Sequence, residues 1–163
     1  MNIFFLHPDP GLAARSLCDK HVPKMALETA QMLCTAVNEH GGTSAYKSAY
    51  KNHPSTVWAR RSQTTFLWLC EHGLAICSEY TKRFGKVHKC EAVIRECQDQ
   101  ISLLPDNGDC TDWVLTENAP QCMPDEYRCD HLIDAYRAYY INEKAYFAKW
   151  EKGTPAPSWW PNV

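Results

Sequence analysis

The sequence lacks a long apolar run and lacks a recognisable export signal. No stretch approaches the roughly 18 apolar residues that mark a membrane-spanning helix, and the charged and polar residues are interspersed throughout. The opening segment MNIFFLHPDP has neither the basic start nor the small-residue cleavage site of a signal peptide. These absences exclude a spanning helix and lead us to expect a soluble, cytoplasmic protein.

CxxC pairs are also missing, although the chain has nine cysteines. They are spread along the sequence, which is typical of small buried thiols in a reducing compartment. A zinc site is the alternative interpretation, because Cys18 and His21 have the CxxH spacing. A second pair of ligands is absent, so we expect no metal.

A strong charge of one sign is the third absence. The formal net charge is −2, which excludes a strongly basic nucleic-acid-binding domain. The charge is uneven, because 12 of the 17 Lys and Arg residues lie in residues 1–100, whereas acidic residues gather in Asp106–Asp134. Local basic clusters are candidates for phosphate binding, although solvated helix faces explain them as well. Their members are Lys47, Lys51, Arg60, Arg61, Lys82, Arg83 and Lys86, with Lys89 beside them.

What the sequence does contain is helical periodicity. With 163 residues and 45% hydrophobic residues, the chain is long enough for one domain with a proper core. We expect a mainly α fold: a single domain over 1–163, built as a bundle of four to five helices after a short extended amino-terminal segment. Apolar spacing and stop signals predict helices over about 22–37, 55–84, 87–104 and 124–150. A long acidic surface loop over 105–124 and an extended tail over 153–163 complete the prediction.

The first long predicted helix also carries a polar stripe. At about 100° per residue, one edge of the apolar face is followed by a row of polar side chains: His21, Lys24, Glu28, Gln31 and Thr35. A histidine, an amine and a carboxylate at such an edge can exchange protons or supply a nucleophile. The simpler interpretation is the solvated flank of an amphipathic helix, with Lys24 and Glu28 as an ordinary i,i+4 pair.

The residues around this stripe resemble a known family. The segments MNIF, CDKHVPKMALETAQML, NHPSTVWARRS and EYTKRFGKVHK are similar to small tailed-phage proteins. More distantly, they resemble the pyrimidine-dimer DNA glycosylases of the endonuclease V type. Those enzymes have an LxDxH turn and, seven residues after its histidine, the catalytic glutamate. Leu17, Asp19 and His21 match the turn, and Glu28 falls on the glutamate.

Two further motifs support the resemblance. Some bacterial members start with a motif like M-x-[IL]-W-x-L-H-P, which is similar to Met1, Ile3, Leu6, His7 and Pro8. In the family a basic turn with Phe and Gly closes a long helix, and residues 82–85, KRFG, look comparable. Two arginines that flank the glutamate in the family are replaced here by Leu27 and Gln31.

The resemblance implies a helical DNA-repair enzyme that acts on damaged or modified pyrimidines in double-stranded DNA without a cofactor, in an infected host cell if the chain is phage-encoded. In the family an amino-terminal amine attacks sugar C1′ to form an imine, the glutamate assists, and β-elimination nicks the strand. Here the amine would be that of Met1, since methionine is usually retained before a residue as large as Asn2. Glu28 and His21 would assist, and Lys24 is the alternative amine.

Two other functions stay open at this point. One is a non-catalytic phage accessory protein that binds a host or phage protein through the acidic segment. The other is an enzyme that acts on free nucleotides, for which His7 and His53, each before a proline, are pocket candidates.

Overall fold

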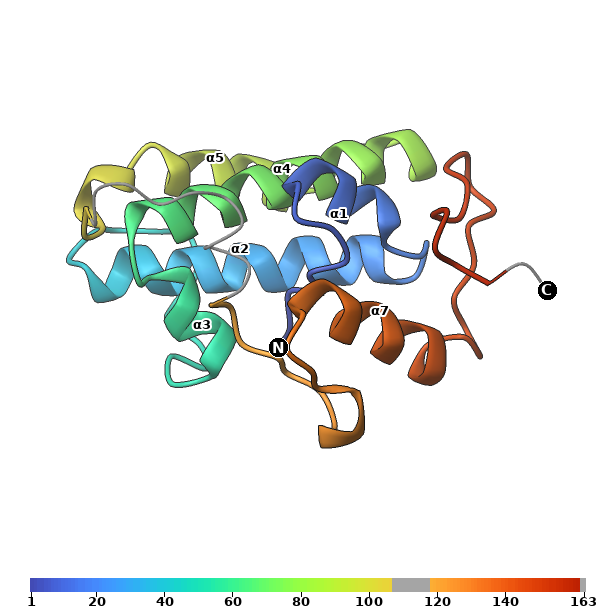
Figure 1. Cartoon of the computed structure of the whole chain (residues 1–163). Coiled ribbons are helices and arrows are strands. Elements are labelled where there is room, and N and C mark those ends of the chain that lie inside the picture. Colours follow the sequence, from blue (N-terminus) through green and yellow to red (C-terminus); the bar gives the residue numbers. More distant parts are fainter. Residues whose placement is uncertain (107–117, 162–163) are drawn as a thin grey trace.

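The computed structural model describes residues 1–106 and 118–161, and within these ranges it is helical with no strand. The elements are α1 (Pro10–Ser16), α2 (His21–Glu39), α3 (Pro54–Ala59), α4 (Gln63–Phe84), α5 (Cys90–Gln98), η1 (Ile101–Leu103), η2 (Asp125–Tyr127) and α7 (Leu132–Glu143) (Figure 1). The mainly α prediction is confirmed. Most of the predicted acidic loop lies on residues 107–117, outside the described residues.

The described residues contain six α-helices rather than four to five, because one predicted helix is divided and the short helix α1 precedes the predicted ones. The break falls between Ala59 and Gln63. There the Ser62 hydroxyl accepts a hydrogen bond from the Thr65 N–H, and the Thr65 hydroxyl oxygen accepts one from the Ser62 N–H. This reciprocal capping satisfies N–H groups at a helix start, so a new helix begins instead of the old one continuing. At the other end of α4, Gly85 takes φ of 73°, a left-handed conformation that ends helices.

The predicted final helix is also shorter than expected. Only α7 forms a regular α-helix within residues 124–150, preceded by η2 and followed by turns. Its apolar residues pack on the core through Leu132, Ala135, Tyr136 and Tyr140. The described residues contain no helix with the length and apolar character needed to cross a membrane.

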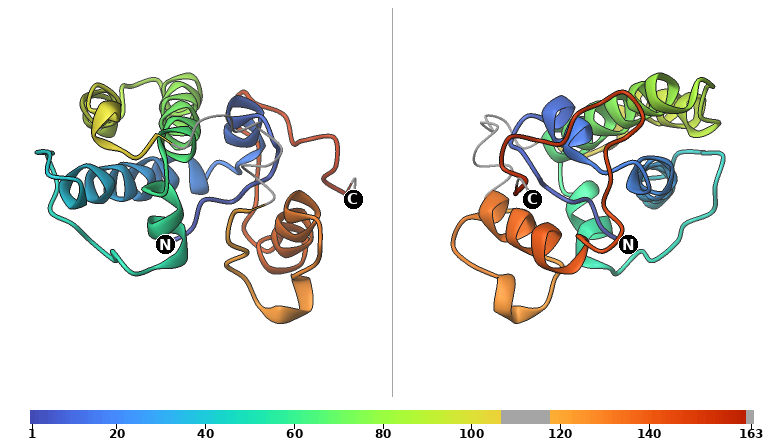
Figure 2. Two further views of the ribbon diagram at one scale, coloured as in Figure 1. Left: turned by 60° about the vertical axis from the view of Figure 1, so that its left-hand side comes forward. Right: turned by 90° about the vertical axis from the view of Figure 1, so that its right-hand side faces the viewer.

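The amino-terminal segment, residues 1–6, runs through the middle of the molecule. Helices α2, α4 and α5 lie on one side of it and α7 on the other (Figure 2). Phe5 is fully buried, with its ring centroid 5.1 Å from that of Trp58, 5.0 Å from Trp68 and 5.6 Å from Tyr136. Because these partners come from α3, α4 and α7, the segment joins helices that are distant in the sequence.

His21, the first residue of α2, belongs to the same aromatic core. Its ring stacks on Phe4 at 4.8 Å, and its Nδ1 lies 2.7 Å from the Tyr140 hydroxyl. Burial is the main cause that lowers the pKa of His21 from 6.5 to about 3, and the nearby positive charges of Lys144 and Lys24 lower it further. The imidazole is therefore neutral, and it packs as a core side chain.

A buried ion network closes the carboxyl-terminal end of α4. The Arg83 guanidinium is fully buried and lies 2.9 Å from Glu79 Oε1 and 3.3 Å from Asp19 Oδ1. It also donates hydrogen bonds to the carbonyls of Leu17 and Arg15. The carboxyl-terminal segment joins in, since Glu79 accepts from the Thr154 hydroxyl and Asp19 from the backbone N–H of Glu151. Arg83, a phosphate-binding candidate by sequence, is thus committed to partners inside the protein.

This network predicts a large loss of stability in Arg83→Met. Removing the guanidinium leaves Asp19 and Glu79 buried without their cation, which typically costs about 3–5 kcal/mol of the free energy of unfolding. Urea denaturation measures the effect, and the exposed neighbour provides the control Lys82→Met, which we expect to change stability by less than about 0.5 kcal/mol. Equal stability of the two variants would contradict the structural role of Arg83.

The neutral state of His21 predicts a stability that decreases in acid. Between its folded pKa of about 3 and the ordinary value of 6.5, the unfolded chain binds the proton and the folded protein does not. Stability is therefore lost as the pH falls below about 6.5, by about 1.4 kcal/mol per pH unit for this one group. Buried His72, whose pKa burial lowers to about 4, adds a parallel loss.

Urea denaturation at pH 7 and pH 5 tests this expectation. Between these values His21→Asn should lose about 2 kcal/mol less than the wild type, whereas the control His131→Asn, at an exposed position, should match the wild type. If the losses of wild type and His21→Asn are the same, His21 titrates normally in the folded protein.

Candidate functional site

The chain start is positioned by its second residue. The Asn2 side chain accepts hydrogen bonds from the N–H groups of Ile3 and Phe4 and donates one of 3.0 Å to the carbonyl of Cys122. Phe4 has φ of 60°, a conformation rare for a non-glycine residue, and its N–H is satisfied by this turn. The turn directs the segment into the core on one side and directs Met1 toward α2 on the other.

The Met1 amine meets the predicted catalytic carboxylate. The ammonium nitrogen lies 3.3 Å from Glu28 Oε1, and the side chains of Met1 and Glu28 are only 2% and 14% exposed. The second oxygen, Glu28 Oε2, is buried and has no hydrogen-bond partner in the part of the chain that the structure describes. The amine and the carboxylate therefore form an ion pair that leaves one carboxylate oxygen free for a second partner.

His53 completes this group. It is the N-cap of α3, where its Nδ1 accepts a hydrogen bond of 3.1 Å from the Ser55 N–H. Burial and then the positive charge of the Met1 amine lower the pKa of His53, whereas the charge of Glu28 raises it. His53 is therefore neutral at physiological pH, and since Nδ1 is an acceptor, the ring proton resides on Nε2.

Polar side chains of α2 position the segment that leads to His53. Thr35 lies on the same helix edge as Glu28, and its hydroxyl oxygen accepts a hydrogen bond of 3.0 Å from the Ala49 N–H. Asn38 donates one of 2.9 Å to the Tyr46 carbonyl. These bonds hold the segment between α2 and α3 along α2 and so lead the chain back toward Glu28. From the sequence, His53 was only a candidate for a nucleotide pocket. The feature that marked its position was the His53-Pro54 pair, which is typical of a helix start.

The other predicted catalytic residues lie elsewhere. His21 is two helical turns, about 10 Å of rise, from Glu28, and it is packed in the aromatic core. The CxxH pair does come together, since the Tyr140 hydroxyl contacts both Cys18 Sγ and His21 Nδ1. No group of three or more potential metal ligands is present among the described residues. Lys24 is exposed, and its positive charge contributes to the lowered pKa of His21.

The structure divides the basic candidates into two groups. Arg60 and Arg61 precede α4, and the exposed Lys47 and Lys51 lie on the segment that leads to His53. Arg60 Nη1 is buried without a hydrogen-bond partner among the described residues, whereas Arg61 donates to the Asn118 carbonyl. The second group follows at the other end of the 22-residue α4, about 30 Å away, where Lys82 and Lys86 are exposed.

Met1 and Glu28 are in contact, and His53 lies near enough for both of their charges to shift its pKa, so that an amine, a carboxylate and a neutral imidazole share one region. The carboxylate can take a proton from the ammonium, which frees a nucleophile, and it can later return or relay the proton. An amine that attacks an electrophilic carbon in this way forms an imine. The arrangement suits covalent catalysis by an amine.

Comparison with known proteins identifies a family. The sequence model of the family described as pyrimidine dimer DNA glycosylase matches residues 1–92, more than half of the chain, and the matched part includes Met1, Glu28 and His53. Comparison with curated proteins and with solved structures produced no match. The chain belongs to the pyrimidine dimer DNA glycosylase family.

Proposed function

We propose that this protein is a DNA glycosylase and abasic-site lyase that acts on damaged or modified pyrimidines in DNA. The observation that carries the proposal is the 3.3 Å contact between the Met1 amine and Glu28. Family membership supplies the substrate class, DNA, and the contact supplies a nucleophile with its proton acceptor.

In the proposed reaction Glu28 accepts a proton from the Met1 ammonium. The neutral amine attacks sugar C1′, the bond between C1′ and the base breaks, and the base leaves with the electron pair. Ring opening then yields an imine between the amine and C1′. Loss of a proton from C2′ expels the 3′ phosphate by β-elimination, and water releases the enzyme. Glu28 Oε2, which has no partner among the described residues, is the proposed acceptor of the C2′ proton.

His53 and the nearby cations have supporting roles in this proposal. A neutral imidazole with its proton on Nε2 can donate a hydrogen bond to the departing base or to the opening sugar. Arg60, Arg61, Lys47 and Lys51 flank the His53 segment, so we assign them to the phosphates around the lesion. Lys82 and Lys86, about 30 Å away, would contact a more distant part of the duplex.

The nucleophile is tested by borohydride trapping on DNA that carries an abasic site or a cyclobutane pyrimidine dimer, followed by peptide mapping. We expect a covalent adduct on the Met1 amine, because reduction fixes the imine. Lys24→Gln should trap as well as wild type, and the same chain with its α-amine blocked by an amino-terminal extension should not trap. An adduct on Lys24, or a folded protein that neither traps nor nicks, would overturn the assignment.

The carboxylate is tested by Glu28→Gln, which keeps the shape of the side chain and removes its charge. Nicking of abasic DNA should fall by at least about 100-fold, the range typical of a lost general acid or base. Affinity for DNA should stay within about twofold, since Glu28 contacts the amine rather than a phosphate. The control is Glu39→Gln at the exposed end of α2, which should nick normally. Normal nicking by Glu28→Gln would remove Glu28 from the mechanism.

A further inference from the structure

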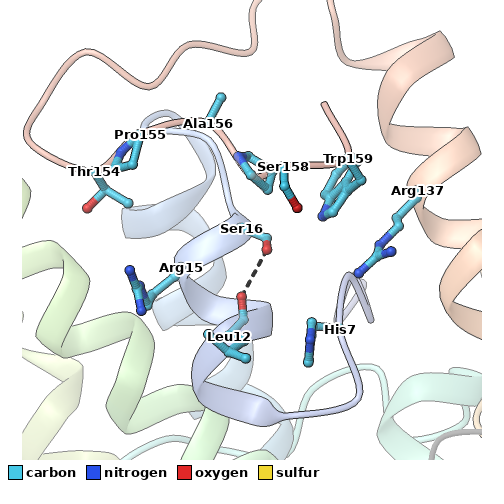
Figure 3. Close-up of a pocket in the computed structure, with 11 residues that line it drawn as sticks. His7, Leu12, Arg15, Ser16, Arg137, Thr154, Pro155, Ala156, Ser158 and Trp159 are labelled. Carbon is cyan, nitrogen blue, oxygen red and sulfur yellow. Dashed lines mark hydrogen bonds between the residues drawn. The ribbon is translucent and has the colours of Figure 1, made fainter. Parts of the chain in front are cut away.

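A second candidate site is a pocket away from the Met1 amine. It is a pocket of about 380 Å³ between α1, α7 and the chain at 154–159, and it shares no residue with the group of Met1, Glu28 and His53 (Figure 3). Its volume falls in the range of small-molecule sites. The proposed reaction does not use it, and seven of its eleven lining residues lie beyond the family match over residues 1–92.

Two arginines and a histidine supply the charged and hydrogen-bonding groups of this pocket. Arg15, Arg137 and His7 line it, and no Asp or Glu is among its lining residues. Figure 3 shows His7 and Arg137 on one side of the pocket and Arg15 on the other. The exposed Arg15 side chain has no hydrogen bond or ion pair to another described residue. The carboxylates whose charges act on Arg137 and His7, Asp134 and Asp9, do not line the pocket. Two guanidinium groups that face a concave site with no carboxylate in its lining favour an anionic ligand.

Arg137 is held in place for such a ligand. Its Nε donates a hydrogen bond of 2.9 Å to the Leu6 carbonyl, and its guanidinium carbon lies 5.3 Å from the centroid of the Trp159 ring. These contacts fix the plane of the guanidinium and leave the terminal N–H groups without a partner among the described residues. A fixed planar fork binds two oxygens of a phosphate or carboxylate at once.

His7 adds a donor of different geometry. Its Nδ1 accepts a hydrogen bond of 2.9 Å from the Asp9 N–H, which places the proton of the neutral ring on Nε2. The remaining wall is largely apolar and rigid, with Pro155, Pro157 and Trp159. Donors on opposite sides and an apolar wall suit a compact oxyanion that is attached to a ring or sugar.

We propose that this pocket binds a phosphate monoester, the group that both a free mononucleotide and the 5′ end of a nicked DNA strand present. Three or more oxygens and up to two negative charges distinguish the monoester from the internal phosphate diester of an intact strand. Arg15 and Arg137 hold the oxygens from two sides, and His7 donates through Nε2.

Titration calorimetry with the intact protein tests the site. The probes are inorganic phosphate, thymidine 5′-monophosphate, thymidine, and one oligonucleotide with either a 5′-phosphate or a 5′-hydroxyl. We expect Arg15→Gln to raise the Kd for the phosphorylated probes by about tenfold, the effect of losing a charged hydrogen bond. Arg137→Lys, which keeps the charge and loses the fork, should also weaken binding. Arg95→Gln on α5 removes the same charge at an exposed position away from the pocket and should leave Kd unchanged within about twofold.

The probes distinguish the two sources of the phosphate. Binding of thymidine 5′-monophosphate but not thymidine, sensitive to Arg15→Gln, identifies a free mononucleotide as a ligand. A preference for the 5′-phosphorylated over the 5′-hydroxyl strand that Arg15→Gln abolishes identifies a DNA end. Absence of binding by every phosphorylated probe, or equal losses in Arg15→Gln and Arg95→Gln, would overturn the proposal. Glu28→Gln should bind the probes as wild type does, so this result is independent of the lyase activity.

Discussion

The arrangement of this protein depends on the burial of its amino-terminal segment. Ile3, Phe5 and Leu6 are at most 1% exposed, and they fill the space between the helices α2 to α5 and α7. Burying these side chains is favourable, and it brings the charged chain start beside α2. Glu28 supplies the compensating negative charge there. The packing that buries the amino-terminal segment therefore also sets the position of the candidate nucleophile.

The region beyond the family match completes this packing. Residues 118–161 cover the far side of the amino-terminal segment, where Tyr136 packs on Phe5 and Arg137 donates to the Leu6 carbonyl. The Asn2 side chain is tied to the Cys122 carbonyl. The matched residues 1–92 thus include the candidate site of Met1, Glu28 and His53, and the later residues hold the amino-terminal segment in place.

The arginines show how one residue type serves different purposes in a small protein. Arg83 neutralises two buried carboxylates and joins α4 to the carboxyl-terminal segment. Arg137 supports the amino-terminal segment and faces a pocket, whereas Arg15 is exposed at that pocket's rim. In sequence, Arg83 lies in the basic cluster KRFGK, which is typical of a phosphate contact. Its partners Asp19 and Glu79 decide otherwise, because a guanidinium surrounded by carboxylates and carbonyls has no donor left for DNA.

The sequence by itself determined the features that depend on neighbouring residues. It predicted the helical fold and the core face of α2, and the family motif in residues 17–28 identified Glu28 as the carboxylate to examine. The break at Ser62 was also present in the sequence as a Ser-x-x-Thr cap, but the continuous apolar pattern concealed it. Only the tertiary structure decided which distant residues come together: Met1 contacts Glu28 with His53 nearby, His21 contacts Tyr140, and Arg15 and Arg137 line one pocket. Helical periodicity assigns a residue to a face, whereas the path of the connecting segments decides what that face contacts.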